Sequence, residues 1–143
     1  MKTKLILAVA PAVLLVISGC QTPASRSTAA VPLAGTKWVL TELNGKPFVA
    51  TETLRAPTLK LDAATKHATG ISGINRFAGG YELDGTKLKF GVFLGTRMAG
   101  PPEAMASEET FLGALQRVSS WKASGNMLEL RDGETTLLKF TAH

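Results

Sequence analysis

Cysteine, histidine and aromatic side chains are scarce in this sequence of 143 residues, which has one cysteine, two histidines and 6% aromatic residues. A chain with only Cys20 cannot form an intramolecular disulfide, so its hydrophobic core must stabilise the fold alone. His67 and His143 have no cysteine or histidine nearby at metal-ligand spacing, so we predict no metal site. Ser72 and Ser107 lack the G-x-S-x-G context of a hydrolase nucleophile, and we therefore expect no enzymatic activity and no cofactor.

Charged residues are also sparse, at 19% of the sequence, and the net charge is +5. The lysines and arginines are scattered along the chain, and few aromatic residues lie among them. A nucleic-acid-binding domain concentrates its basic residues on one face, so we expect no nucleic-acid partner. The length is that of a single domain with one core.

An apolar run over residues 5–17 follows Lys2 and Lys4 and is shorter than the ~20 residues of a membrane-spanning helix. It ends in Ile17-Ser18-Gly19-Cys20, which is similar to the lipobox of bacterial lipoproteins. There a peptidase cuts before the cysteine, whose thiol carries diacylglycerol. We predict a signal peptide over residues 1–19 and a covalent lipid on Cys20. The alternatives are an ordinary signal peptide or a buried helix, each with an incidental cysteine.

Gln21, rather than Asp, follows the predicted lipidated cysteine. In a Gram-negative cell this resembles the signal for transport to the outer membrane, so we expect an anchor on the periplasmic face of that membrane. In a cell with a single membrane, the protein would stay on the plasma membrane. Residues 21–34 are rich in Ser, Thr, Ala and Pro, and predict a flexible tether from the lipid to a domain over residues 35–143.

Alternating apolar and polar residues predict a mainly β domain. In residues 58–62, for example, Leu59 and Leu61 fall on one face of a strand. Asn44-Gly45 predicts a turn, and Gly70 interrupts a weaker strand, where it indicates a bulge. We predict strands over residues 36–43, 58–62, 67–71, 81–83, 86–90, 92–96, 126–131 and 135–141, and a loop over 72–79.

Two hairpins are predicted from turn residues. Asp84-Gly85 predicts a two-residue turn that places Tyr81, Leu83, Leu88 and Phe90 on one apolar face. Its predicted pairs are Leu83 with Thr86, Glu82 with Lys87, Tyr81 with Leu88 and Gly80 with Lys89. In the C-terminal hairpin, a two-residue turn would put Leu138 and Phe140 on the polar face. We therefore predict a three-residue loop, Asp132-Gly133-Glu134, with Gly133 near αL, which pairs Leu128 with Leu138 and Leu130 with Thr136.

One helix is predicted to begin at Gly100-Pro101-Pro102-Glu103, with Gly100 as the N-cap and proline at the first helical position. An apolar stripe follows at helical spacing. We interpret the stripe as core packing against a sheet, and the alternative is a docking face for a partner. The stripe comprises Met105, Phe111, Leu112, Leu115 and Val118.

Several short motifs occur together: Ser72-Gly73, Asn75-Arg76-Phe77, Gly80-Tyr81, Leu88, Phe90, Thr96-Arg97-Met98-Ala99, Glu108, Phe111, Leu112, Leu115 and Leu128-x-Leu130. This set resembles the META domain, HslJ-like family over about residues 35–140. The resemblance implies a mainly β (α+β) fold, a small antiparallel, partly open barrel-like sheet with one helix packed against it. It also implies an envelope lipoprotein without a settled reaction; some members are linked to heat shock, drug tolerance or motility. The shape is similar to that of pilotin lipoproteins, which escort secretin subunits to the outer membrane.

The sequence departs from the common family pattern at two positions. Many members have cysteine where this chain has Ile74 and Gly100. Both cysteines are absent here, as expected if the two form a disulfide in those members. A redox role inferred from the family therefore does not extend to this chain.

The first hairpin brings its two outer ends together, so we predict that the loops on either side of it are neighbours near the helix start. Phe77 and Met98 are expected to point inward, and at least one of the two loop arginines is expected to bond loop carbonyls or Glu108. The alternative is that these loops recognise a ligand. The candidate residues are Asn75, Arg76, Phe77, Thr96, Arg97 and Met98, with Glu108 as a possible ion-pair partner.

Two functions of different class are compatible with these features. The first is a non-enzymatic envelope lipoprotein that binds or stabilises a protein partner at the membrane, in stress tolerance or in a pilotin-like role. The second is a carrier of a small hydrophobic ligand in a groove of the partly open sheet. A deep cavity would favour the carrier, whereas a packed core with an exposed apolar patch would favour the protein partner.

Overall fold

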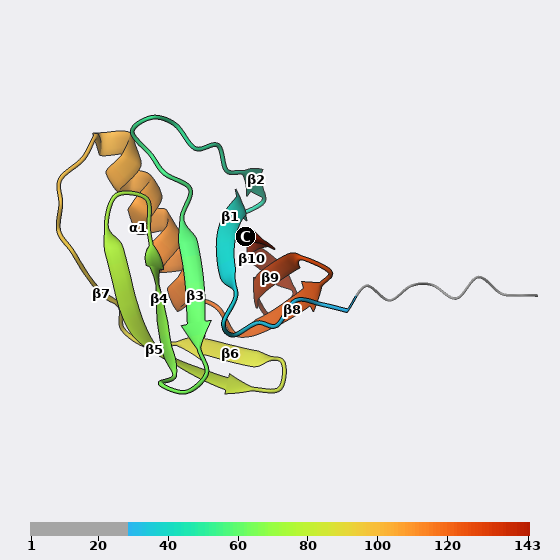
Figure 1. Ribbon diagram of the computed structural model, residues 1–143. Coiled ribbons are helices and arrows are strands. Elements are labelled where there is room, and N and C mark those ends of the chain that lie inside the picture. The colour runs from blue at the N-terminus through green and yellow to red at the C-terminus, as the bar shows by residue number, and fades with distance from the viewer. Residues whose placement is uncertain (1–28) are drawn as a thin grey trace, which may run out of the picture.

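The computed structural model describes residues 29–143, so the predicted signal peptide, Cys20 and most of the predicted tether lie outside the described residues. These described residues form ten strands and one helix (Figure 1). These are β1 (Lys37–Leu43), β2 (Lys46–Pro47), β3 (Thr58–Asp62), β4 (His67–Ile71), β5 (Arg76–Asp84), β6 (Lys87–Phe90), β7 (Leu94–Gly95), α1 (Pro102–Gln116), β8 (Ser120–Ser124), β9 (Met127–Asp132) and β10 (Thr135–Ala142). Within this part of the chain, no helix is long and apolar enough to cross a membrane.

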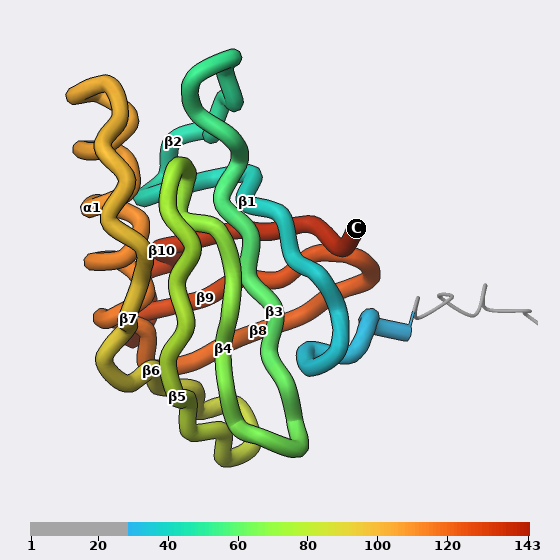
Figure 2. The backbone as a smooth tube through the Cα atoms, turned by 60° about the vertical axis from the view of Figure 1, so that its left-hand side comes forward, coloured from blue at the N-terminus to red at the C-terminus, as the bar shows by residue number. Residues whose placement is uncertain are grey.

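Eight of the strands close into an antiparallel barrel in the order β10-β9-β8-β6-β5-β4-β3-β1, because β1 also pairs with β10. One seam is weak, since β6 and β8 share a single residue pair, Lys87 with Ser120. The helix α1 packs against β10 and β6, on the same side of the barrel as this seam (Figure 2). The predicted mainly β fold, a partly open barrel-like sheet with one helix against it, is confirmed.

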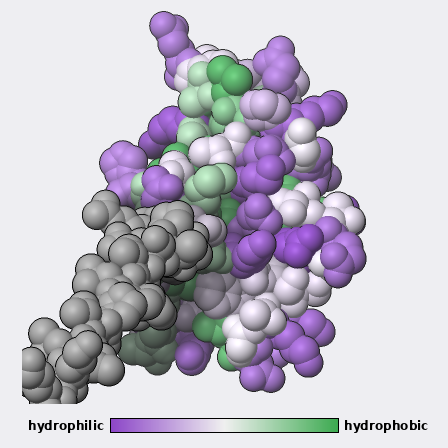
Figure 3. Space-filling model, turned by 90° about the vertical axis from the view of Figure 1, so that its right-hand side faces the viewer, coloured by the Kyte–Doolittle hydropathy of each residue, from purple (hydrophilic) through white to green (hydrophobic). Residues whose placement is uncertain are grey.

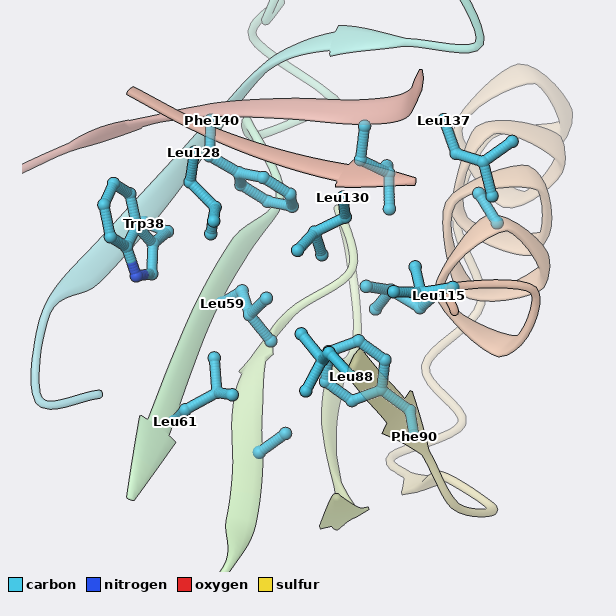
Figure 4. Close-up of a cluster of buried hydrophobic side chains, with 14 of the residues drawn as sticks. Trp38, Leu59, Leu61, Leu88, Phe90, Leu115, Leu128, Leu130, Leu137 and Phe140 are labelled. Carbon is cyan, nitrogen blue, oxygen red and sulfur yellow. The ribbon is translucent and has the colours of Figure 1, made fainter. Parts of the chain in front are cut away.

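Side chains fill the interior of the barrel. Every strand except the short β2 and β7 contributes inward side chains, because alternate residues of a strand point to the same face. Leucines from β3, β6 and β9 converge there with Trp38, Phe140 and Leu115 of the helix (Figure 4). The largest fully buried apolar side chains are Trp38, Phe111, Phe140, Leu59, Leu61, Leu88, Leu115, Leu128, Leu130 and Leu138.

The β5–β6 hairpin has the predicted apolar face but a different register. Asp84 pairs with Lys87, Leu83 with Leu88, Glu82 with Lys89 and Tyr81 with Phe90. The turn is therefore Gly85-Thr86, and the predicted pairs are wrong by two residues. A two-residue loop needs positive φ at its first position, which Gly85 adopts at 57°. A shift of two residues does not change which side chains share a face, so the error left the predicted core unchanged.

The predicted register of the C-terminal hairpin is also wrong. The loop is Gly133-Glu134, with Asp132 opposite Thr135, and not the three-residue loop that we predicted. Leu130 faces Leu138 and Leu128 faces Phe140, because a bulge at Leu137 inserts one residue between Thr136 and Leu138. The bulge lets both Leu137 and Leu138 be buried, and the Leu137 carbonyl accepts a hydrogen bond from the Asn44 N–H at 2.7 Å. Gly133 has positive φ, 57°, as predicted.

Of the remaining local predictions, the turn at Asn44-Gly45 is confirmed, and those for Gly70 and the loop over 72–79 need correction. Asn44 and Gly45 form the predicted turn, with φ values of 49° and 79°. The predicted bulge at Gly70 is wrong, because β4 pairs in continuous register with both neighbours. A Cβ at Gly70 would overlap the Thr58 carbonyl, so glycine is needed there for close approach of two strands. The predicted loop over 72–79 is shorter, since β5 begins at Arg76, and the strand β8 was not predicted.

The helix begins one residue later than predicted, with Pro101 as the N-cap and Pro102 as the first helical residue. Its buried face comprises Ala104, Glu108, Phe111, Ala114 and Leu115. Met105 and Leu112, which we assigned to the core stripe, are only half-buried. Most of the stripe therefore packs into the core, and its edge remains open to solvent.

Part of the predicted tether lies against the barrel. Leu33 is buried, and its carbonyl accepts a hydrogen bond from Trp38 Nε1 at 2.9 Å. The Val31 N–H donates to the Gly125 carbonyl at 2.8 Å, at the turn between β8 and β9. The packed part of the chain thus begins before Gly35, the predicted start of the domain.

Candidate functional site

The structure brings the two sequence motifs together at the start of α1. Asn75 ends the loop before β5, Arg76 and Phe77 are the first residues of β5, and Thr96 follows β7. The Thr96 N–H donates to the Arg76 carbonyl at 3.0 Å, and the Arg76 N–H donates to Thr96 Oγ1 at 3.1 Å. The two loops are therefore neighbours, as predicted.

Asn75 is the centre of this junction, and its side chain is 3% exposed. Its Nδ2 donates to Glu108 Oε1 at 2.8 Å and to the Met98 carbonyl at 3.2 Å. Its Oδ1 accepts from Thr96 Oγ1 at 2.8 Å and from the Met98 N–H at 2.7 Å. The amide thus uses both donors and both acceptor positions, and it joins the β5 loop, residues 96–98 and α1.

Glu108 is the only buried carboxylate among residues 29–143. Its Oε2 accepts hydrogen bonds from the Asn75 N–H at 2.8 Å and the Ile74 N–H at 3.2 Å. Burial alone would raise the pKa of Glu108, but the hydrogen bonds from the Asn75 backbone and side chain and from Ile74 outweigh it and lower that pKa. The carboxylate therefore stays charged at neutral pH and is stabilised by amide donors. The Ser72 hydroxyl donates to the Asn75 carbonyl at 3.0 Å. We call Ser72, Asn75, Thr96, Met98 and Glu108 the Asn75–Glu108 junction.

The predicted role of the arginines is wrong. Arg76 and Arg97 are both exposed, and within the described part of the chain neither side chain makes a hydrogen bond or an ion pair. Amide N–H groups already satisfy the Glu108 carboxylate, so it needs no arginine. Phe77 points inward as predicted and is 4% exposed, whereas Met98, also predicted to point inward, is 51% exposed.

Ile74 and Gly100, the two positions where the family pattern has cysteine, lie next to each other at this junction. A Cβ built on Gly100 would overlap Ile74 Cδ1. The isoleucine side chain therefore occupies the space over Gly100. An apolar contact holds the two loops together at this point in a chain that has no cysteine there.

A groove lies beside the junction, between α1 and the segment that precedes β7. Its volume is about 760 Å³. Its walls are mostly apolar, and its charged lining residues are Glu108 and Glu109. We call it the α1 groove; it is lined by Val92, Phe93, Pro102, Met105, Ala106, Glu108, Glu109, Leu112, Gly113 and Gln116.

Three exposed apolar side chains occur in residues 92–98; Val92 lines the α1 groove, and Leu94 lines a second hollow over β4 and β5. Val92 is 80% exposed, Leu94 77% and Met98 51%, so half of the six large exposed hydrophobic residues of the described chain lie within seven positions. Sequence reasoning placed residues 92–96 in a strand and did not identify this surface. The alternation of Val92 and Leu94 was visible in the sequence. The sequence did not show that Phe93, between them, is the side chain that is partly buried.

The α1 groove lies on the side of the barrel away from the start of the described chain. In Figures 1 and 2, α1 and β7 lie on the left, and residues 29–34 lie on the right. The face on that right-hand side is mostly hydrophilic where it is visible, with apolar residues in small patches (Figure 3). Within residues 29–143, no group of three His, Cys, Asp or Glu side chains is placed to hold a metal ion.

Residues 31–143 match the family model described as META domain. The chain belongs to the META domain family. Among solved structures, an NMR structure of a protein from Burkholderia xenovorans has a TM-score of 0.59 and 27% identity, and the match covers 86% of this chain and 97% of that chain. A second NMR structure has a TM-score of 0.58, 24% identity and coverage of 76% and 90%.

The META domain fold also extends to more distant proteins. A crystal structure of a DUF4847 family protein from Bacteroides vulgatus has a TM-score of 0.54 and 16% identity, with coverage of 76% of this chain and 93% of that chain. This likeness and that to the second NMR structure bear on the fold alone. No curated protein sequence matches the chain.

Proposed function

We propose that this META domain protein is a non-enzymatic, lipid-anchored envelope protein that binds a protein partner through the α1 groove. The observation that carries the proposal is the mostly apolar α1 groove, with the 80% exposed Val92 on its wall. Contiguous apolar surface on a small domain is typical of an interaction site. Binding or stabilising an envelope partner in this way would suit a role in stress tolerance or a pilotin-like role.

Packing of the barrel interior supports a partner over a carried ligand. The interior side chains Trp38, Leu61, Leu88 and Phe140 are each at most 3% exposed and pack into one continuous core in the described chain. A carrier of a small hydrophobic ligand needs an enclosed apolar cavity that surrounds most of the ligand. The α1 groove instead opens to solvent along Val92, which suits a protein surface.

The polar chemistry of the junction supports a role other than catalysis. An acid catalyst needs a carboxyl group within reach of substrate. Glu108 is buried and accepts hydrogen bonds from Asn75 and Ile74, and the Ser72 hydroxyl donates to the Asn75 carbonyl at 3.0 Å. These groups are occupied in holding three segments together.

The membrane anchor is the second part of the proposal and rests on Ile17-Ser18-Gly19-Cys20 and Gln21. Cys20→Ser should abolish palmitate labelling and release the protein from the membrane fraction. Wild-type protein expressed in parallel is the control. Unchanged labelling and fractionation of the variant would contradict the anchor.

Photo-crosslinking in living cells tests partner binding. p-Benzoylphenylalanine would replace Val92, which is 80% exposed and lines the α1 groove, and in a matched control Val49, which is 74% exposed and does not line it. We expect a covalent adduct with a discrete envelope protein at position 92 and none at position 49, identified by mass spectrometry. An adduct with lipid alone at position 92 would support the carrier instead. Absence of any adduct at position 92 would refute partner binding there.

A further inference from the structure

The strand β7 has an open edge, and Val92 and Phe93, the two residues before it, line the α1 groove. β7 pairs with β5 through Gly95 with Phe77 and Leu94 with Ala78, and within the described residues no strand pairs with its other side. An open strand edge presents N–H and C=O groups that another extended chain can pair with. At the far end of the groove, Gln116 Nε2 donates to the Gly91 carbonyl at 2.7 Å. One backbone group of this segment is therefore already satisfied by the helix.

A glycine in the last turn of α1 forms part of the groove wall. Gly113 lines the groove and is exposed, and a Cβ built there would have no atom within 4 Å. Glycine inside a helix costs about 1 kcal/mol relative to alanine. No neighbour in the described chain requires a glycine at this position. Its effect on the surface is that no side chain projects from this position into the groove.

The charged residues at the groove favour a binding partner with positive charge. Glu109 is exposed on α1 and makes no ion pair within the described residues. Glu103 lies on the first turn of the same helix, and no lysine or arginine occurs between Pro102 and Gln116. The Glu108 carboxylate is held by Asn75 and Ile74. A partner that enters the groove thus meets an unpaired carboxylate, which complements a lysine or arginine.

We propose that the α1 groove takes an extended segment of a partner protein, with alternating apolar and basic side chains, that adds as a strand to the open edge of β7. Apolar side chains of that segment lie against Val92, Met105 and Leu112, and a basic side chain lies near Glu109. This inference rests on the proposed function, and it names the chemistry of the partner. An acyl chain cannot pair with backbone N–H and C=O groups, and the groove lies on the side away from residues 29–34, so a protein segment suits it better than a lipid surface.

Fluorescence anisotropy of a labelled peptide tests this inference on the full-length protein in detergent micelles. The probe is a short peptide of alternating valine and lysine. A matched peptide with glutamate in place of lysine should bind about tenfold or more weakly, because it meets Glu109. A version N-methylated at alternate amides should bind about fivefold or more weakly, because it cannot pair with the β7 edge.

The protein variant for this test is Gly113→Leu, which fills the groove without removing any contact. It should weaken binding of the lysine peptide about tenfold while its melting temperature does not fall. Glu109→Lys should reverse the preference between the lysine and glutamate peptides, whereas Glu134→Lys should leave it unchanged, because Glu134 does not line the groove.

Several results would overturn the inference. Equal binding of the N-methylated peptide would exclude strand addition. Equal binding by Gly113→Leu, or no binding of any peptide at about 1 mM, would exclude the groove or this chemistry. Self-association of the protein that Gly113→Leu abolishes would make a second copy the occupant. In each of these cases a protein adduct at position 92 in cells would still support the proposed function, whereas loss of that adduct would refute the function whatever the peptides show.

Discussion

The Asn75–Glu108 junction and the α1 groove meet on α1 at Glu108, which belongs to both, and they differ in burial and polarity. The centre of the junction is buried and polar, with Asn75 3% and Glu108 7% exposed and four hydrogen bonds to the Asn75 side chain. The groove is apolar and solvent-exposed, and it borders a strand edge without a partner among the described residues. Asn75 and Glu108 therefore hold three segments of the chain together, and most of the groove wall beside them comes from residues outside the motifs.

Residues of the buried face and residues of the groove wall alternate along α1 at helical spacing. Glu108, Phe111 and Leu115 are on its buried face, and Met105, Leu112 and Gln116 line the groove. Substitutions on the two faces should therefore have different consequences. Buried-face variants should lose stability, and groove variants should lose binding while remaining folded.

Asn75→Ala should produce the largest loss of stability. It removes the side-chain donor to Glu108 and the acceptor for Thr96 and Met98, and leaves a buried carboxylate short of partners. We expect the free energy of unfolding to fall by about 3–5 kcal/mol, measured by urea unfolding. The matched controls Arg76→Ala and Arg97→Ala remove exposed side chains and should each cost under about 0.5 kcal/mol. A cost above about 1 kcal/mol for either arginine would restore the structural role that the sequence had predicted for it.

Leu115→Ala and Leu112→Ala compare the two faces with the same chemical change. Leu115 is fully buried, so its loss should lower the free energy of unfolding by about 2–5 kcal/mol. Leu112 is half-buried in the groove wall, so its loss should cost about 1 kcal/mol or less. Equal losses in urea unfolding would show that the groove wall is part of the core.

The pH dependence of stability tests the charge state of the junction. The pKa of Glu108 is lower in the folded protein than its ordinary value of about 4.5, so the folded state binds the proton less tightly than the unfolded state does. Glu108 therefore stabilises the fold above pH 4.5, and this contribution is lost as the pH falls through the folded pKa. The Glu108→Gln variant should lose less stability than the wild type when the pH falls below 4.5. Thermal unfolding at a series of pH values measures this loss. The exposed control Glu109→Gln should keep the wild-type profile, and a wild-type profile in Glu108→Gln would contradict this account.

Gly113→Ala should have a small effect of the opposite sign. The position is helical and exposed, and a Cβ there would meet no atom within 4 Å. Alanine should raise the free energy of unfolding by about 0.5–1 kcal/mol through its higher helix propensity. Loss of stability on this substitution would show that the groove is narrower than the structure has it.

Local patterns in the sequence were enough to predict most elements of this protein and the faces they bury. Alternation in residues 58–62 placed Leu59 and Leu61 in the core, where both are fully buried. The proline pair at Pro101-Pro102 marked the start of α1, and Asn44-Gly45 marked a turn. Such features depend on φ preferences and on a period of two residues, which act between neighbours in the chain. The apolar face of the β5–β6 hairpin was correct even with the register wrong, because a two-residue shift preserves parity.

The strand registers and the long-range partners, by contrast, come from the tertiary structure. The bulge at Leu137 forms because the barrel can bury two successive leucines there, and the Asn44 N–H meets the extra carbonyl. Glu108 accepts hydrogen bonds from Asn75, 33 residues earlier, and not from an arginine. The fold places amide donors next to its carboxylate, and both loop arginines are exposed. The α1 groove and the open edge of β7 are likewise products of packing. They depend on which segments meet in space, and no local pattern of residue types encodes such a meeting.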